Sequence, residues 1–171
     1  SNTTTDSVVN GSAEVGGLAG TVGNQGTIEY ASANSTVTGS TRVGGLVGEN
    51  GNVIRQTFAT GAVTGSLDAG GLVGNNTRYR DTGTVTNSYW DEVATGQATS
   101  SGNATGLTTA QMTGAAAADN MTGLDFGTVW QTDPSGYPTL VWQRESGLLS
   151  VPFTTTFDNG LEGWTVNQRF R

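Results

Sequence analysis

Residues that could carry out chemistry are few in this sequence. His, Cys and Lys are absent, so the commonest general base and the thiolate and amine nucleophiles are missing. Asp91 and Glu92 form the one adjacent acidic pair. Neighbouring side chains on a strand point to opposite faces, so this pair is poorly placed to act on one substrate. We therefore expect no catalytic residue, no enzyme activity, no metal site and no cofactor.

Ligand binding is the chemistry that the sequence favours. Arg78, Tyr79 and Arg80 lie on a long turn, which is where repeat proteins place binding surfaces. This turn could meet an anionic glycan or the acidic loop of a partner, or it could be a solvated insertion. Trp90 and Asp91 form a second candidate, near the end of the repeats. We predict that these five residues contact a ligand.

The composition narrows the class of protein. The net charge of −7 leaves no basic stripe for the phosphates of nucleic acid. An acidic chain without Lys suits a salt-rich habitat, although a low-Lys bias explains it equally. With 34% hydrophobic residues and 27 glycines, a large conventional core is not expected, and abundant Thr, Val and Gly favour short strands. We predict an all-β protein without a transmembrane segment, because no apolar run approaches about 18 residues.

A repeat of the form Gly-Gly-Leu-(Ala/Val)-Gly provides the architecture. It starts at Gly16, Gly44 and Gly70, so the copies are 28 and 26 residues apart. A unit of this length, poor in apolar residues, buries a face only by stacking on its neighbours. The sequence therefore predicts a β-solenoid of about three coils, in which equivalent residues stack one strand spacing, about 4.8 Å, apart.

Equivalent residues of the copies predict four columns. The expected core columns are Leu18, Leu46 and Leu72; Ile28, Ile54 and Val85; and Val9, Val37 and Val63. A charged column of Glu14, Arg42 and Asp68 alternates in sign and is expected to set the register rather than to form a site.

The chain is expected to divide at changes of pattern. Residues 8–15 would end a preceding coil, and the coils would cover 16–43, 44–69 and 70–90, within a repeat domain of residues 1–90. A C-terminal cap with a short helix is expected over 91–142, because Thr108 and Gln111 form a capping-box pattern and Trp130, Leu140 and Trp142 could close the solenoid end. A linker (143–152) and the start of a truncated second β domain (153–171) would follow.

Several segments resemble the GLUG-motif repeat family of large surface proteins. The resemblance covers roughly residues 8–142 and rests on residues 43–50, 59–65, 87–91 and 136–140. It implies a solenoid in adhesin-like or stalk-like proteins and supplies no catalytic residue. Val22 and Ser32 depart from the pattern and make the first copy atypical. Residues 156–164 are similar to the start of a carbohydrate-binding or lectin-like jelly-roll domain.

These observations favour a non-catalytic structural or adhesive module of a large extracellular or cell-surface protein that forms stalks or filaments. The alternative is a glycan-binding module of a secreted multidomain protein or of a carbohydrate-active enzyme. The expected partners are other copies or further repeats of the same protein and surface glycans. Export is supported by Asn-x-Ser/Thr acceptors for N-glycosylation, although Asn and Thr are also common in β-turns. These acceptors are Asn2, Asn10, Asn34, Asn75, Asn103 and Asn120.

Overall fold

The computed structural model describes residues 4–5, 7–23 and 25–145. Asn2, the linker from residue 146 onward and the expected second domain (153–171) lie outside the described residues. Strands dominate the described part, and its helices are only four or five residues long. The predicted all-β class is therefore confirmed.

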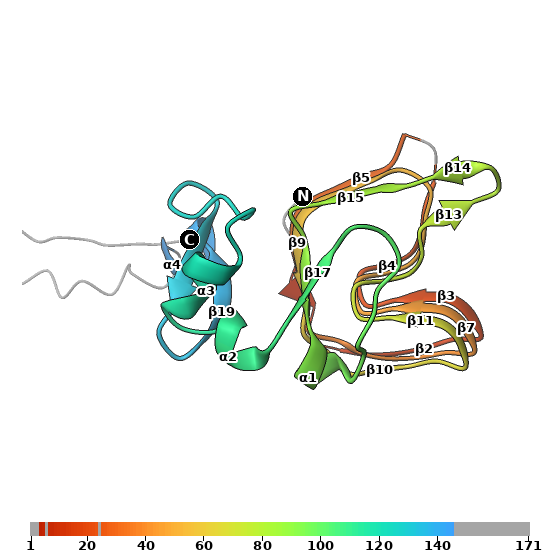
Figure 1. Ribbon diagram of the computed structural model, residues 1–171, viewed down its shortest axis with the longest axis horizontal. Coiled ribbons are helices and arrows are strands. Elements are labelled where there is room, and N and C mark those ends of the chain that lie inside the picture. Colours follow the sequence, from red (N-terminus) through yellow and green to blue (C-terminus); the bar gives the residue numbers. More distant parts are fainter. Residues whose placement is uncertain (1–3, 6, 24, 146–171) are drawn as a thin grey trace, which may run out of the picture.

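Parallel pairing between equivalent strands of successive repeats organises the fold. Three sheets each contain three such strands, and within each sheet the strands overlay one another in Figure 1. Their strands are β2 (Val8–Asn10), β6 (Thr36–Thr38) and β10 (Val63–Thr64); β3 (Ala13–Gly16), β7 (Thr41–Gly44) and β11 (Leu67–Gly70); and β4 (Ala19–Val22), β8 (Val47–Asn50) and β12 (Val73–Asn75).

A fourth, larger sheet runs along one side of the stack. Its centre is the pair of seven-residue strands β5 (Thr27–Ala33) and β9 (Val53–Ala59). The short strand β1 pairs with β5, whereas β15 and β16 both pair with β9 and β17 pairs with β16. These shorter strands are β1 (Thr4–Thr5), β15 (Thr84–Thr86), β16 (Tyr89–Asp91) and β17 (Thr105–Leu107).

The register between repeats is the one that the sequence predicts. Val9 pairs with Val37 and Val37 with Val63, while Ile54 pairs with both Ile28 and Val85. The leucines also follow one another, because the N–H of Leu46 donates to the carbonyl of Leu72 at 2.9 Å and that of Leu18 donates to Leu46 at 3.0 Å. Leu46, Leu72 and Ile54 are completely buried. The predicted columns are thus confirmed in register and in the burial of their second and third members, whereas Leu18, Ile28 and Val9 of the first copy are only partly buried.

Close approach of the backbones explains the glycines of the repeat. A Cβ on Gly48, in β8, would lie 2.5 Å from the carbonyl carbon of Glu14 and 2.6 Å from the nitrogen of Val15, both in β3. A Cβ on Gly45 would overlap the carbonyl oxygen of Gly71 in the next repeat. Any side chain at either glycine would therefore push neighbouring strands apart.

The charged column lies at a bend that each repeat makes with a left-handed residue. Glu14, Arg42 and Asp68 have φ of 54°, 52° and 52°. Glu14 and Arg42 form an ion pair at 2.7 Å, as alternation of sign predicts. Asp68, however, is exposed, and Arg42 turns instead to Glu49, with its Nε 3.5 Å from Glu49 Oε1. The bend, and not the alternation of charge, is what all members of the column share.

Beyond Trp90 the chain continues across the third repeat. It first forms α1 (Glu92–Thr95) and then runs along β12, where the N–H of Gly71 donates to Thr99 and that of Ser101 donates to Val73, both at 3.0 Å. It then enters β17. Residues 97–107 therefore cover the edge of the last repeat. We expected Trp130 and Trp142, farther along the chain, to close this end.

The segment with those tryptophans packs beside the stack rather than on its end (Figure 1). Phe58 and Tyr89 point outward from the large sheet and share a core with Met112, Met121 and Trp130. The predicted helix is present, because α2 begins after Thr108, whose N–H donates to Gln111 Oε1 at 3.0 Å. The elements of this lateral cap are α2 (Thr109–Met112), α3 (Ala116–Asn120), β18 (Trp130–Asp133), β19 (Gly136–Leu140) and α4 (Val141–Glu145).

Candidate functional site on the projecting hairpin

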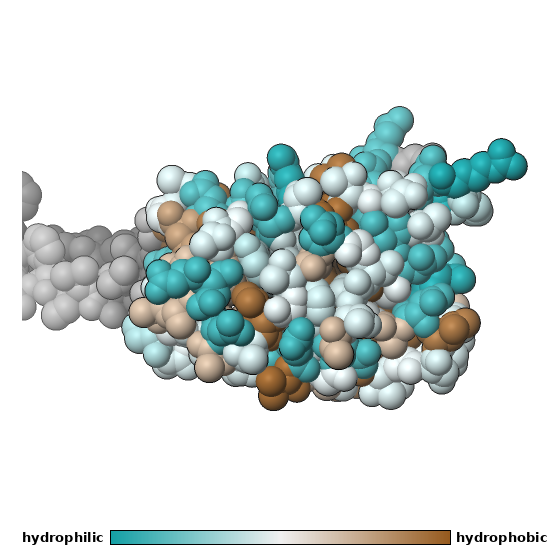
Figure 2. All heavy atoms as spheres, in the orientation of Figure 1, coloured by the Kyte–Doolittle hydropathy of each residue, from teal (hydrophilic) through white to brown (hydrophobic). Residues whose placement is uncertain are grey.

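The long turn of the third repeat folds into a small hairpin. The strands β13 (Thr77–Arg78) and β14 (Asp81–Thr82) pair in antiparallel fashion. The hairpin is closed by the N–H of Gly83, which donates to the carbonyl of Asn76 at 2.9 Å. It projects from the stack in Figure 1, and a hydrophilic projection stands at the same place in Figure 2.

Buried asparagines hold the base of this hairpin. Asn50 is completely buried, and its Nδ2 donates to Asn76 Oδ1 at 2.7 Å. Asn76 Nδ2 donates in turn to the carbonyl of Gly83, also at 2.7 Å. The first repeat has Val22 at the equivalent position, where it pairs with Asn50. The hairpin is therefore anchored to the second repeat by a polar ladder, for which the one sequence signal is the recurrence of Asn after 26 residues.

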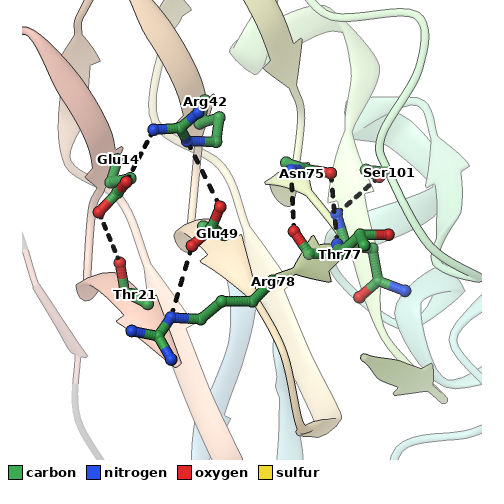
Figure 3. A network of polar contacts seen from close by, with 9 residues as sticks. Glu14, Thr21, Arg42, Glu49, Asn75, Thr77, Arg78 and Ser101 are labelled. Carbon is green, nitrogen blue, oxygen red and sulfur yellow. Dashed lines mark hydrogen bonds and ion pairs between the residues drawn. The ribbon is translucent and has the colours of Figure 1, made fainter. Parts of the chain in front are cut away.

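Arg78 holds the hairpin against the stack and is not a free ligand group. Its Nε lies 3.5 Å from Glu49 Oε2, and its guanidinium points back toward the earlier repeats (Figure 3). A Cβ on Gly51 would lie 2.7 Å from Arg78 Cβ, and a Cβ on Gly23 would lie 3.5 Å from Nη1. The side chain thus passes over glycines of both preceding repeats, and a larger residue at Gly51 would clash with it.

Glu49 connects Arg78 to the charged column. Its two oxygens face Arg42 and Arg78, and Arg42 Nη2 donates to Glu14 Oε1 at 2.7 Å (Figure 3). Thr21 donates its hydroxyl to Glu14 Oε2 at 3.1 Å. The hydrogen bonds from Arg42 and then Thr21 hold the pKa of the Glu14 carboxyl below its ordinary value. The network alternates in sign across three repeats.

Tyr79 and Arg80 remain at the tip, facing solvent. The Tyr79 side chain is 84% exposed, although its φ of 57° is one that bulky residues rarely adopt. The guanidinium carbon of Arg78 lies 4.5 Å from the centre of the Tyr79 ring, which is cation–π distance. Arg80 is exposed and has no ion pair among the described residues. The tip therefore exposes the Tyr79 ring, which Arg78 contacts, together with the charged side chain of Arg80, which has no ion pair among the described residues.

Trp90 and Asp91 are not part of this site, because both lie inside the protein. Trp90 stands over Gly71, is 6% exposed and donates its ring N–H to the carbonyl of Gln97 at 2.8 Å. Asp91 is completely buried. Its Oδ1 accepts from the N–H groups of α1 at 2.8 Å, and its Oδ2 accepts from the hydroxyl of Tyr137 at 2.6 Å. Burial and this contact raise the pKa of Tyr137. Trp90 and Asp91, which were predicted to contact a ligand, stabilise the fold instead.

The described glycosylation acceptors differ in their surroundings. Asn10, Asn34 and Asn103 are exposed. Asn75 and Asn120 are partly buried, and their Nδ2 atoms donate to the backbone carbonyls of Thr77 and Ala116, at 2.9 and 2.8 Å. Among the described residues, no cluster of His, Cys, Asp and Glu could hold a metal ion, and no helix is long and apolar enough to cross a membrane.

Comparison with known proteins gives one partial likeness. The chain is 48% identical over 58 residues to Halomucin from Haloquadratum walsbyi (strain DSM 16790 / HBSQ001). The matched stretch is 33% of this chain and 1% of Halomucin. No model of a protein family matches the chain, the GLUG family included. No solved structure matches it.

Proposed function

We propose that this chain is a non-catalytic, β-solenoid module of GLUG type in a large extracellular or cell-surface repeat protein. The observation that carries the proposal is the stacking of equivalent strands in one register, with Val37 pairing on one side with Val9 and on the other with Val63. Each repeat contacts its neighbours through the same residues, so the height of such a stack is set by the number of repeats.

The likeness to Halomucin of Haloquadratum walsbyi supports the proposed surface location in a salt-rich habitat. An acidic chain of net charge −7 without Lys fits the same habitat. The small share of Halomucin that is matched, 1%, is what a module repeated within a very long chain would give.

The two ends of the stack also support the proposal. Residues 97–107 cover the edge formed by β12 and β16, and Gln97 Nε2 donates to the carbonyl of Val63 at 2.9 Å. On the opposite edge, β2, β3 and β4 have a strand partner on one side only, among the described residues. Further repeats of the same protein would therefore pair on the β2–β3–β4 edge.

The insertion of an additional repeat tests the solenoid. A second copy of residues 44–69, placed between Ala69 and Gly70, joins the sequence where the equivalent Gly44 and Gly70 pair. We expect the protein to fold, to lengthen along the stack by about 4.8 Å in small-angle X-ray scattering, and to unfold at the same or a higher temperature.

The matched control carries the same 26 inserted residues in scrambled order. Because scrambling removes the glycine positions and the apolar columns, that variant should lose cooperative unfolding. If both insertions unfolded the protein, or if both were tolerated as loops without the increase in length, the solenoid proposal would be wrong.

Glycan binding at the hairpin tip is a second candidate function, favoured by the 84% exposure of Tyr79 beside the unneutralised Arg80. An aromatic face packs against the C–H groups of a sugar, and Arg contacts sulfate or carboxylate oxygens. Calorimetric titration with a sulfated polysaccharide should detect binding that Tyr79→Ala and Arg80→Ala each weaken by about tenfold, or about 1.4 kcal/mol. Trp142→Ala, at the other exposed aromatic residue (51%) of the part that the structure describes, is the control and should not change the affinity. Equal weakening by all three variants would contradict the proposal.

A further inference from the structure

We infer that the folded protein accepts N-linked glycans at Asn10, Asn34 and Asn103 and excludes them from Asn75 and Asn120. All five described acceptors share the Asn-x-Ser/Thr pattern, so the sequence alone does not rank them. In the structure the acceptors differ in the hydrogen bonding of one atom, the side-chain nitrogen Nδ2 to which a glycan is attached.

Transfer of a glycan makes demands on that nitrogen. A bond forms between Nδ2 and C1 of the first sugar, and the bond from C1 to the phosphate oxygen of a polyprenyl-phosphate-linked donor breaks. The nitrogen loses a proton to a base of the transferase, and the polyprenyl phosphate leaves with the electron pair. Nδ2 must therefore reach the transferase with its N–H groups unengaged.

The excluded acceptors fail on this demand. Asn75 Nδ2 donates to the carbonyl of Thr77 at 2.9 Å, and Asn75 Oδ1 accepts from the N–H of Thr77 at 3.3 Å. Both atoms of the amide are thus engaged by the threonine of its own acceptor motif. Asn120 is the last residue of α3, where its Nδ2 donates to the carbonyl of Ala116 at 2.8 Å.

The accepted positions meet the demand. Asn10, Asn34 and Asn103 are exposed, and within the part of the chain that the structure describes no hydrogen bond involves their Nδ2 atoms. Asn34 uses only its Oδ1, which accepts from the hydroxyl of Thr60 at 3.2 Å. The hydroxyl residues of the three motifs are exposed as well; they are Ser12, Thr36 and Thr105.

An in vitro assay tests the acceptor pattern. The folded full chain is incubated with a lipid-linked oligosaccharide and an oligosaccharyltransferase chosen because it modifies short peptides that carry each of the five motifs. Peptide mass spectrometry then measures the occupancy of each site. We expect occupancy at Asn10, Asn34 and Asn103, and at least about tenfold less at Asn75 and Asn120, the discrimination that about 1.4 kcal/mol would produce.

Comparable occupancy at all five sites of the folded chain, or none at the three exposed sites, would overturn the inference. The peptides show that sequence is not what limits Asn75 and Asn120. The biological use of these sites depends on the export proposed above, but the assay does not, so a cytoplasmic location and a wrong acceptor pattern would be told apart.

Discussion

The replacement of Gly48 by Ala tests how closely the sheets of the stack approach each other. The new Cβ would lie 2.5 Å from the carbonyl carbon of Glu14, 2.6 Å from the nitrogen of Val15 and 2.7 Å from the carbonyl oxygen of Gly20. Ordinary carbon contacts begin near about 3.5 Å, so β8 would have to move by roughly 1 Å. All three neighbours are main-chain atoms, which cannot rotate away as a flexible side chain would.

We expect Gly48→Ala to lower the free energy of unfolding by about 3 kcal/mol, at the upper end of the range for overpacked cores. In urea unfolding followed by circular dichroism, this corresponds to a fall in the midpoint of about 1–3 M, for slopes of about 1–3 kcal/mol per M. Gly136→Ala is the matched control, because no atom lies within 4 Å of its added Cβ. That variant should change the unfolding free energy by less than about 1 kcal/mol.

An unfolding free energy for Gly48→Ala that lies within about 0.5 kcal/mol of the Gly136→Ala value would refute this reasoning. It would mean that the sheets separate freely, and that the repeated glycines reflect turn conformation instead of close approach.

Further predictions concern the ladder, the bend and the charged network. Asn50→Val, which copies the first repeat, leaves the side-chain oxygen Oδ1 of Asn76 without its donor and should lower the unfolding free energy by about 1–3 kcal/mol in urea titrations. An unchanged midpoint would show that the ladder does not contribute to stability. Asp68→Val places a β-branched residue at a φ of 52° and should lower the melting temperature, while Asp68→Asn should leave it nearly unchanged. The pKa of the Glu14 carboxyl is lower in the folded protein than its unfolded value of 4.5, so its ionisation stabilises the fold above pH 4.5. This stabilisation is lost as the pH falls through the lower folded pKa, and Glu14→Gln should therefore show a weaker pH dependence of unfolding below pH 4.5. An unaltered acid unfolding profile would exclude the pairing of Glu14 with Arg42.

The register of the fold could be predicted because it repeats in the sequence. Leu18, Leu46 and Leu72 recur at the period of the glycines, and a one-repeat period with parallel pairing leaves only one way to align them. The left-handed residues at the bends could not be predicted in this way. Glu14 and Arg42 are of types that seldom adopt positive φ, so the bend is imposed by the stack and not by local preference.

The site was predicted in part, and its misplaced residues have physical reasons. Tyr79 and Arg80 are exposed on the long turn, as the turn length indicates. Arg78 lies against the stack because Gly23 and Gly51, far away in sequence, leave room for its side chain. Trp90 is buried because Gly71 opens the space that its ring fills. In both cases the decisive signal is a glycine distant in the sequence, which local reading of the motif does not include.

The two unusual residues of the first repeat, Val22 and Ser32, can be explained by the positions of the hairpin and the lateral cap. Val22 stands where Asn50 and Asn76 stand, and those asparagines hold the base of the hairpin. Ser32 pairs with Phe58, and Phe58 belongs to the core of the lateral cap, with its ring centre 5.2 Å from that of Trp130. The later repeats therefore differ from the first where they anchor the hairpin and the cap. The first repeat, which has neither the buried asparagine nor the aromatic residue at these two positions, is the plainer unit, and its Val and Ser are the residues to expect where repeats contact only other repeats.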